Sequence, residues 1–489
     1  MILTNFEFFI PELFITVNLL FILIYSIVYV NKSKQGIWNY NNSIRNLSLI
    51  NLGLALFILI FIKYNLVTNS YLLGGGLIMT NDWVLTIKII ILLCSFILRL
   101  IEHKIENYEY SILISLAVLG MMVILSASDL IVLYLGIELL SLTLYILATL
   151  NKKGELSTEA GLKYFIIGAV SSGILLIGCA LIYSNTGLTG YIELENYIIY
   201  ENTKNIGGIL IVISMMIKLA VAPFHMWAPD VYDGSPTIVT AFFALVPKIA
   251  LFGALVTLIS GPFIGLIAKY QELLIVSASL SIIIGTLGAL NQIKLKRLMA
   301  YSAISHMGFI LIGLSTISLN GLIATLIYFI LYIFMTLLTF TIILNIAPNS
   351  ANPLTLLIGL SRINPLLTLS LTLSLLSIAG VPPLAGFLSK FYILNSALQN
   401  NMWVVTIIAV LASMVSAFYY LQLIKLMWFK DSQYFNIKIL SDVTTLSIKR
   451  FSLASSTIIA FSTFIVLTAL IFPTPWLVLA NQTIIGLLV

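Results

Sequence analysis

The sequence predicts an all-α polytopic membrane protein with about 14 transmembrane helices. Sixty per cent of its 489 residues are hydrophobic and only 9% are charged, and the mean hydropathy is +1.11. A soluble globular domain could not cover its surface with so few polar residues. In addition, apolar stretches long enough to cross a bilayer follow one another along the whole chain.

Fourteen stretches come close to the roughly 20 apolar residues that a span requires. The connections between them are too short for a soluble domain, the longest being 31–46, 185–205 and 425–452. We expect the spans near residues 10–30, 47–62, 83–100, 109–127, 129–150, 162–184, 206–222, 237–260, 272–291, 298–317, 321–347, 365–397, 402–424 and 453–479.

Prolines interrupt two of these spans, the seventh and the twelfth. Pro223 lies in MIKLAVAPFHMW (216–227), and Pro382 and Pro383 lie in SIAGVPPLAGFLSKF (377–391). Proline breaks a helix, and within a bilayer the freed backbone groups require protein or water partners. Each break has a lysine nearby, and the two spans run in opposite directions because they are five apart. This pattern indicates a transport site between inverted repeats, although apolar helices with Pro and Gly can also look alike by chance.

Four ionisable side chains within the predicted spans are candidates for moving protons. They are Glu138 in the fifth span, Lys218 before the break in the seventh, Lys248 beside Pro247 in the eighth, and Lys390 in the twelfth. A charge near mid-membrane costs about 2.5–3.5 kcal/mol on insertion scales and often marks an ion path. Burial disfavours a charged lysine and a nearby carboxylate favours it, so a lysine whose carboxylate can move acts as a proton switch.

Each of these residues also has a structural alternative, as does His306 in the tenth span. Glu138 could be a protonated or hydrogen-bonded glutamate, and Lys218 could extend to the membrane interface. Lys248 could bind a backbone carbonyl, and Lys390 could lie near the membrane surface. His306 titrates near physiological pH and suits a proton relay, but a hydrogen-bonded core histidine is the alternative. The first, second, third and fourteenth spans carry no central charge and are interpreted as scaffold.

The lysines and arginines predict the orientation in the membrane. Of these 24 residues, seventeen fall in connections after odd-numbered spans, three lie within the membrane, and four fall in connections after even-numbered spans, namely Lys63, Lys88, Lys204 and Lys269. Positively charged loops stay on the cytoplasmic or matrix side. Both termini are therefore predicted on the opposite side, which is the periplasm or the intermembrane space.

Several classes of function have no support in the sequence. No Gly-rich phosphate loop follows a predicted strand, and Cys94 and Cys179 lie in separate apolar stretches without metal-ligand spacing. We therefore expect no cofactor and no metal in this chain. Basic patches interleaved with aromatic residues are absent, so nucleic acid is not an expected partner. The N-terminus lacks the basic region of a cleavable signal.

Three motifs resemble the antiporter-like membrane subunits of respiratory complex I. They are MIKLAVAPFHMWAPDVYDGSPTIVTAFFALVPK, IKLKRLMAYSAISHMGF and GVPPLAGFLSKFY, and the resemblance extends over about residues 110–430. It implies two inverted five-helix repeats and a hydrated polar axis at mid-membrane. Lysine at both position 248 and position 390 fits the branch called subunit 2, or subunit N in bacteria, better than its larger siblings.

The resemblance also implies a domain organisation. We expect a three-helix scaffold over residues 1–108, a first five-helix repeat over 109–260 and a second, inverted repeat over 272–424. Residues 425–489 would form a loop and the last transmembrane helix.

The function implied is that of a proton-translocating membrane-arm subunit of NADH:ubiquinone oxidoreductase. NADH, flavin, iron–sulfur clusters and ubiquinone would be bound by other subunits. Their redox chemistry would change the electrostatics of Glu138 and Lys218, and the proton would pass to Lys248 and Lys390, with His306 and water completing the path. The expected partners are other membrane-arm subunits, including an antiporter-like sibling, and the lipid bilayer.

The expected location is the mitochondrial inner membrane, with the bacterial plasma membrane as the alternative. Two other functions stay open. One is a subunit of a multi-subunit Na⁺/H⁺ antiporter, whose members share these motifs, and the other is a membrane-arm subunit that conducts no protons.

Overall fold

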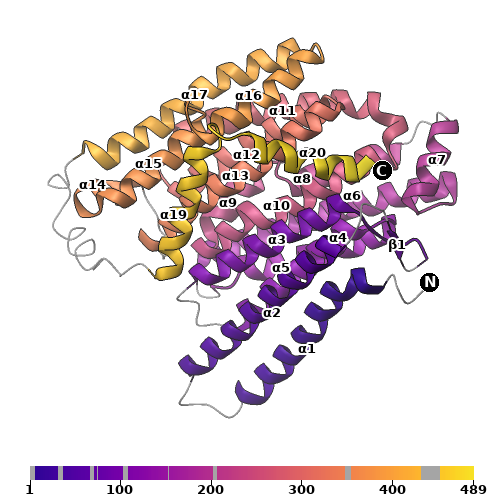
Figure 1. Cartoon of the computed structure of the whole chain (residues 1–489), viewed down its shortest axis with the longest axis horizontal. Coiled ribbons are helices and arrows are strands. Elements are labelled where there is room, and N and C mark those ends of the chain that lie inside the picture. Colours follow the sequence, from indigo (N-terminus) through magenta and orange to yellow (C-terminus); the bar gives the residue numbers. More distant parts are fainter. Residues whose placement is uncertain are drawn as a thin grey trace. The chain divides into compact units, whose positions relative to one another are not determined.

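The computed structural model describes residues 6–30, 37–65, 71–73, 75–102, 108–151, 154–201, 206–346, 354–430 and 452–488. Within these residues the chain is helical apart from short connections and one two-stranded hairpin (Figure 1). This confirms the predicted all-α class. A helix satisfies its own backbone hydrogen bonds, which a single segment in a bilayer can achieve in no other way.

The chain forms two compact units. Unit 1 consists of Met1–Leu219, Val246–Ile267 and Gln482–Val489, and unit 2 consists of Ala220–Leu245 and Ala268–Asn481. The first boundary between them therefore directly follows Leu219, inside the predicted break of the seventh span. The predicted boundaries of the two five-helix repeats stay a prediction.

Unit 1 contains the N-terminal helices and the first part of the predicted first repeat. Its strands pair antiparallel, with Tyr71 opposite Thr80 and Leu73 opposite Ile78. Its elements are η1 (Phe6–Phe9), α1 (Ile10–Val30), α2 (Ile37–Asn65), β1 (Tyr71–Leu73), β2 (Ile78–Thr80), α3 (Asp82–Ile101), α4 (Tyr108–Ser126), α5 (Leu130–Ala148), α6 (Glu155–Thr186), α7 (Tyr191–Glu201), α8 (Ile206–Lys218), the second part of α10 (Thr237–Ser260), η2 (Ile264–Leu266) and the end of α20 (Thr474–Leu488).

Unit 2 begins with the residues that follow the first break. Within it α13 packs against α12, α15, α16 and α19, and α17 packs against α15 and α16. Its elements are α9 (Trp227–Gly234), the first part of α10, nearly all of α11 (Ile267–Leu290), α12 (Leu295–Ser315), α13 (Leu319–Ile346), η3 (Leu354–Leu357), α14 (Leu360–Ile363), α15 (Pro365–Ala379), α16 (Ala385–Gln399), α17 (Trp403–Trp428), α19 (Leu453–Thr468) and the first part of α20 (Thr474–Leu488).

Eleven helices of the described residues are long and apolar enough to cross a membrane. They coincide with eleven of the fourteen predicted spans. The other three predicted spans fall on shorter apolar helices, α8, α15 and α19. The shortness of α8 and α15 has the predicted cause, because both end at the proline-containing breaks.

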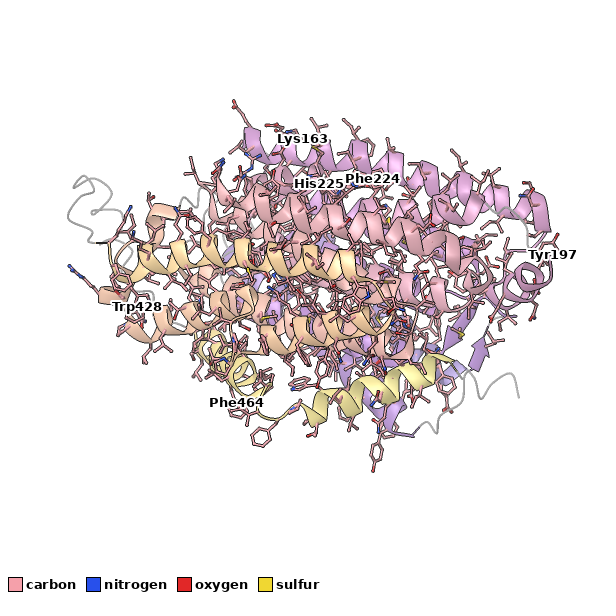
Figure 2. The ribbon with its side chains drawn as sticks, turned by 90° about the horizontal axis from the view of Figure 1, so that it is seen from above. Lys163, Tyr197, Phe224, His225, Trp428 and Phe464 are labelled. Atoms are coloured by element: carbon pink, nitrogen blue, oxygen red, sulfur yellow. The ribbon has the colours of Figure 1, made fainter. Side chains whose placement is uncertain are left out.

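The breaks themselves confirm the prediction for spans seven and twelve. Residues 219–226 separate α8 from α9, and residues 380–384 separate α15 from α16. Phe224 and His225, labelled in Figure 2, lie in the first break, where His225 is buried and Phe224 is partly exposed. The peptide bonds preceding Pro223 and Pro383 are both cis.

The last predicted span differs from the structure. Residues 453–479 were expected to form one helix, but α19 ends at Thr468 and a separate helix, α20, begins at Thr474. Pro473 and Pro475 flank the start of α20, and proline cannot continue a preceding helix. Phe464 projects from α19 in Figure 2 and is 64% exposed, as expected for a side chain that faces lipid.

One close helix contact positions the seventh span in unit 1. A Cβ atom at Gly207 of α8 would lie 2.6 Å from the Gly178 carbonyl oxygen of α6, and one at Gly178 would lie 2.8 Å from the Gly207 carbonyl oxygen. Only glycine permits this approach, which is typical of membrane helices that pack through small residues. The contact holds α8, and so Lys218 at its end, against α6.

Candidate functional site

The predicted carboxylate of the site lies midway along α5. The Asp129 side chain caps this helix by accepting a hydrogen bond from the Ile131 amide at 2.7 Å, and the Thr189 hydroxyl donates to the same carboxylate at 2.7 Å. Two turns further on, the partly buried Glu138 carboxylate accepts a bond from the Ser141 hydroxyl at 3.4 Å. Tyr134, one turn earlier on α5, also interacts with this carboxylate.

Lys218 is the last residue of α8 and belongs to the same unit as Glu138. The carbonyl groups at the end of a helix have no partners within it and carry a partial negative charge, which favours a cation there. Glu138 is near enough to act electrostatically on Lys218. Among the described residues, however, neither side chain takes part in an ion pair within 4.0 Å.

Lys248 lies in the part of α10 that belongs to unit 1. It directly follows Pro247, which removes one backbone hydrogen bond inside the helix. The side chain is only 5% exposed. An ammonium group at such a position requires polar partners, because burying an unpaired charge costs several kcal/mol.

The remaining predicted lysine, Lys390, lies in unit 2 on the first turns of α16. Its ammonium donates a hydrogen bond at 2.7 Å to the carbonyl of Ala379, the last residue of α15. It also lies 5.2 Å from the centre of the Phe309 ring, within the range of a cation–π contact. Lys390 thus binds the negative end of the half-helix that precedes the break.

His306 lies midway along α12, also in unit 2, and is 3% exposed. A hydrogen bond of 2.5 Å joins its Nδ1 atom to the hydroxyl of Tyr328 on α13. The alternative of a hydrogen-bonded core histidine and the relay hypothesis both fit this contact. The sequence carries no signal that singles out Tyr328, because tyrosine in an apolar stretch is usually a packing residue.

The start of α12 holds α9, the half-helix after the first break. Arg297 forms an ion pair with Asp230 at 2.8 Å and Lys294 forms one with Asp233 at 2.7 Å. Between them, the buried Lys296 donates to the Ser235 carbonyl, at the end of α9, at 2.8 Å. We call these three contacts the basic clamp. The sequence indicated only that the three basic residues mark the cytoplasmic or matrix side, whereas in the structure they also hold the half-helix α9 in place.

A buried ion pair joins the first and third spans, which the sequence predicted to be scaffold without a central charge. Lys88 of α3 binds Glu12 of α1, and each side chain is 1% exposed. The charge count had assigned Lys88 to a connection, although the predicted third span began before it. The position of Lys88 five residues inside an apolar stretch was the signal that could have revealed this pair.

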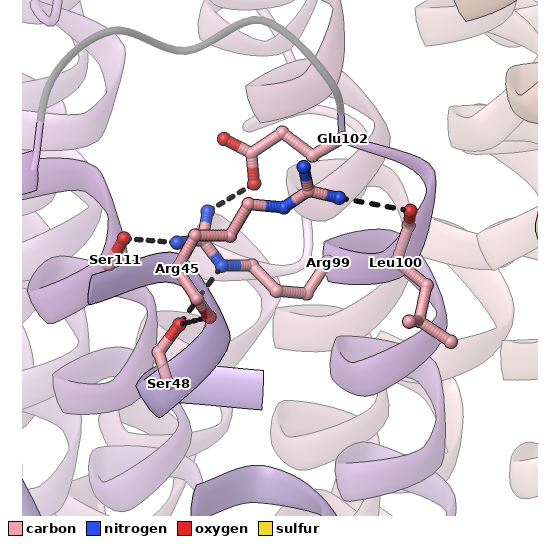
Figure 3. Close-up of polar contacts among 6 residues, drawn as sticks. All are labelled: Arg45, Ser48, Arg99, Leu100, Glu102 and Ser111. Carbon is pink, nitrogen blue, oxygen red and sulfur yellow. Dashed lines mark hydrogen bonds and ion pairs between the residues drawn. The ribbon is translucent and has the colours of Figure 1, made fainter. Parts of the chain in front are cut away.

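A second polar cluster lies at the opposite end of α3 (Figure 3). Arg99 binds the Glu102 carboxylate and the Ser111 hydroxyl, and its Nε donates to Ser48 at 3.2 Å. Arg45 donates to the Leu100 carbonyl at 3.3 Å. Burial raises the pKa of Glu102, while the adjacent Arg99 opposes this effect. The cluster joins α2, α3 and α4, which fits a scaffold.

Comparison with known proteins connects these features to one family. Residues 127–416 match the sequence profile described as "NADH:quinone oxidoreductase/Mrp antiporter, TM". The chain is 40% identical over 435 residues to NADH-quinone oxidoreductase subunit N of Pelagibacter ubique, covering 87% of this chain and 90% of that one. It is 34% identical over 489 residues to NADH-ubiquinone oxidoreductase chain 2 of Marchantia polymorpha, covering 96% of each chain.

A solved structure agrees with this result. A chain of respiratory complex I from Thermus thermophilus matches with a TM-score of 0.78 and 28% identity, covering 96% of this chain and 99% of that one. The shared fold, the family profile and the full-length relatives agree. The chain therefore belongs to the family of antiporter-like membrane subunits that includes NADH-quinone oxidoreductase subunit N and NADH-ubiquinone oxidoreductase chain 2.

Proposed function

We propose that this chain is a proton-translocating membrane-arm subunit of an NADH:quinone oxidoreductase. The observation that carries the proposal is the placement of Lys218 at the open end of half-helix α8, within electrostatic range of Glu138 but in no ion pair with it. A pair that is close but not bonded can change its separation. Such a change alters the proton affinity of the lysine, because a nearby carboxylate favours the charged ammonium.

In this mechanism Glu138 and Lys218 receive the signal in unit 1. When the carboxylate moves away or is neutralised, Lys218 loses its proton to Lys248. In unit 2, Lys390 and His306 carry the proton further, with Ala379 holding the Lys390 ammonium in place. A continuous path between the two units is part of the proposal and follows from the family resemblance.

The redox reaction belongs to other subunits in this proposal. NADH, flavin, iron–sulfur clusters and quinone would be bound there, and this chain would bind none of them. Its partners would be other membrane-arm subunits, including an antiporter-like sibling. The membrane would be the mitochondrial inner membrane or a bacterial plasma membrane, with both termini on the intermembrane-space or periplasmic side. The count that supports this orientation includes residues outside the described ranges, among them Lys32, Lys104 and Lys438.

The test is to replace Glu138 or Lys218 with alanine in the intact complex. A positioned proton-transfer group contributes about 10²–10⁴-fold to a rate, so we expect proton pumping to fall about tenfold or more. Assembly should be preserved, because neither side chain takes part in an ion pair among the described residues. Pumping would be measured in vesicles and assembly on native gels.

Matched controls are available on helix surfaces. Glu159→Ala removes a carboxylate that is 58% exposed on α6, and Lys163→Ala removes a lysine that is 41% exposed on the same helix. Both variants should pump as the unmodified complex does. Normal pumping by well-assembled Glu138→Ala and Lys218→Ala variants would refute the proposed role and favour a subunit that conducts no protons.

The family profile also names Mrp antiporters, so a role in a multi-subunit Na⁺/H⁺ antiporter is the second candidate. Purification of the intact assembly separates the two. Flavin and iron–sulfur subunits that co-purify in stoichiometric amounts support the first function, whereas their absence together with Na⁺-dependent proton exchange supports the second.

A further inference from the structure

A cluster of buried hydroxyl groups in unit 2 has no part in the mechanism proposed above. Tyr328 and Tyr332 of α13 and Tyr419 and Tyr420 of α17 are each at most 2% exposed. Tyr328 and Tyr332 contact the buried His306 of α12, and Tyr420 lies near both of them. We call these five residues the tyrosine cluster. Tyrosine is a costly choice for a fully buried position, because its hydroxyl group requires a partner.

The rings of the cluster are in contact with one another. The ring centres of His306 and Tyr332 are 5.1 Å apart, and those of Tyr419 and Tyr420 are 4.3 Å apart. His306 is joined to Tyr328 by a hydrogen bond of 2.5 Å. One turn further along α12, Phe309 stacks on Tyr328 and contacts the Lys390 ammonium. The cluster therefore adjoins both proposed proton carriers of unit 2.

Among the described residues, neither the Tyr419 nor the Tyr420 hydroxyl has a hydrogen bond of normal geometry. The two tyrosine side chains lie near each other, and Tyr419 also lies near Ser305 and Tyr420 near Ser302. Both serine hydroxyls donate to carbonyls of their own helix, at 2.7 and 2.8 Å. A buried polar group without a partner costs about 1–3 kcal/mol. Several such groups side by side form the polar surroundings that ordered water occupies.

The directions of α12 and α17 show which end of unit 2 lies nearest to these hydroxyls. The Asn400 side chain donates to the Ser318 hydroxyl at 3.3 Å, and the Ser315 hydroxyl contacts the sulfur of Met402 at 3.7 Å. The end of α12 and the start of α17 thus lie together, so the start of α12 and the end of α17 lie at the other end of unit 2. This end carries Lys294 and the residues that follow it, together with Lys425, and we call it the basic end.

Helix geometry then orders the groups by depth. At 1.5 Å per residue, Ser302 lies about 10 Å from the start of α12 and Tyr420 about 12 Å from the end of α17, whereas His306 lies about 16 Å from the start of α12. Tyr420 and Ser302 are therefore closer to the basic end than His306 by about one helical turn, whereas Tyr419 and Ser305 lie at nearly the same depth as His306. The four hydroxyls thus extend from the level of His306 toward the basic end.

We propose that Tyr419 and Tyr420, with Ser302 and Ser305, hold water molecules that deliver protons from the basic end of unit 2 to His306. Each hydroxyl accepts a proton from one neighbour while it donates its own proton to the next, so no tyrosinate accumulates. His306 accepts the delivered proton, becomes an imidazolium and then donates a proton to Lys390. This inference rests on the proposed function and adds a proton-uptake branch to it. The tyrosine hydroxyls would be the proton-transfer groups, and the aromatic rings would contribute only packing.

The experiment replaces both tyrosines with phenylalanine, which removes the hydroxyls and keeps the rings. In vesicles that contain the intact complex, we expect the Tyr419→Phe/Tyr420→Phe variant to pump about tenfold more slowly, because each lost group is a positioned proton donor and acceptor. The ratio of pumping rates in H₂O and D₂O should also rise, since proton delivery becomes the slow step. A purely structural role of the hydroxyls would leave this ratio unchanged.

The control is Tyr392→Phe, which removes a partly buried hydroxyl of α16 outside the cluster and should change neither quantity. If the double variant does not assemble, each single variant still lacks one hydroxyl and should show a smaller loss of the same kind. Unchanged pumping and an unchanged isotope ratio in assembled variants would overturn the inference. The Lys218→Ala variant, measured in the same vesicles, separates the two hypotheses. If Lys218→Ala loses pumping while the tyrosine variants pump normally, only the proton-uptake branch is refuted. If Lys218→Ala also pumps normally, the proposed function is refuted as well.

Discussion

Each of the two broken spans has a lysine ammonium at the C-terminal end of its first half-helix, but the lysine comes from a different part of the span in each case. In the first break, Lys218 is itself the last residue of the half-helix α8. In the second, Lys390 comes from the half-helix after the break and reaches back to the last carbonyl of α15. In both cases a cation lies at the negative end of a half-helix, where unpaired carbonyls favour it.

The difference between the breaks lies in how tightly the lysine is held. Lys390 has a hydrogen bond to Ala379 and contacts the Phe309 ring, and a Cβ atom at Gly380 would lie 2.8 Å from its side chain. Lys218 is half-buried and forms no ion pair among the described residues, although Glu138 acts on it electrostatically. A loosely held lysine can respond to a distant signal, and a tightly held one suits a fixed step in a path.

The backbones of the two breaks differ in the same sense. Just after α15, Gly380 has a φ of +90°, a conformation that costs glycine little. At the corresponding place after α8, Ala220 has a φ of +58°, which costs an alanine about 1–2 kcal/mol. The first break therefore carries local strain that the second avoids, and strain of this kind often occurs where a segment must change conformation.

The largest effect is expected from a substitution that prevents α16 from packing against the end of α15 at the second break. Gly386 of α16 donates its amide to the Ser377 hydroxyl at 3.0 Å, and a Cβ atom there would overlap the Ser377 carbonyl oxygen. Because backbone cannot yield as a flexible side chain does, Gly386→Ala should destabilise the chain by about 3 kcal/mol or more. We expect this subunit to be lost from the assembled complex, as measured on native gels.

A control for this prediction exists in α6. A Cβ atom at Gly173 would have no neighbour within 4 Å, so Gly173→Ala should assemble normally. If Gly386→Ala assembled as well as Gly173→Ala, the contact between α16 and the end of α15 would tolerate an added methyl group, which contradicts the close packing seen in the structure.

The next effect compares the lysines directly. Lys390→Met removes the donor to the Ala379 carbonyl, and a buried polar group without a partner costs about 1–3 kcal/mol. Lys218→Met removes no ion pair found in the described residues. We expect both variants to lose pumping, but only Lys390→Met to lower the melting temperature of the purified complex. Equal shifts in the two melting temperatures would contradict the distinction between a held and a loose lysine.

The smallest effect concerns the basic clamp on α9, the half-helix after the first break. Lys296→Met removes the buried donor to the Ser235 carbonyl, which should cost about 1–3 kcal/mol. Arg297→Ala breaks an ion pair whose side chains are 37% and 33% exposed, and such pairs contribute about 0–1 kcal/mol. Hydrogen exchange of the α9 amides should therefore rise more in Lys296→Met than in Arg297→Ala.

Salt provides a check on this order. The contribution of the exposed pair is screened by ions, so the effect of Arg297→Ala should become smaller at high ionic strength, while that of Lys296→Met should persist. Exchange that rises equally in both variants would show that α9 is held by packing and that the clamp adds little.

Much of the fold was predictable because each span carries its own signal. Apolar length identified the helices, and Pro223, Pro382 and Pro383 identified the two breaks, since a proline interrupts a helix whatever surrounds it. The last span was predicted as one helix over residues 453–479, although Pro473 and Pro475 lie within that range. The predicted proton-transfer roles of Glu138, Lys218, Lys248, Lys390 and His306 stay predictions.

The contacts of these residues were not predictable in the same way. Sequence spacing places Lys390 after a break, but only the packing of α16 on the end of α15 brings its ammonium to the Ala379 carbonyl. Likewise Lys88 and Glu12 are 76 positions apart and meet because α1 and α3 lie in the same unit. Tyrosines dispersed over two helices form a cluster around His306 for the same reason.

The sequence by itself determined the membrane class, the helical segments and the two interruptions, because these depend on local composition and on the backbone chemistry of proline. The tertiary structure alone decided which lysine is bonded and which is loose, which charges pair in the N-terminal helices, and which hydroxyls gather near a histidine. Those outcomes depend on how residues far apart in the chain approach one another, and a buried polar group takes its properties from those neighbours.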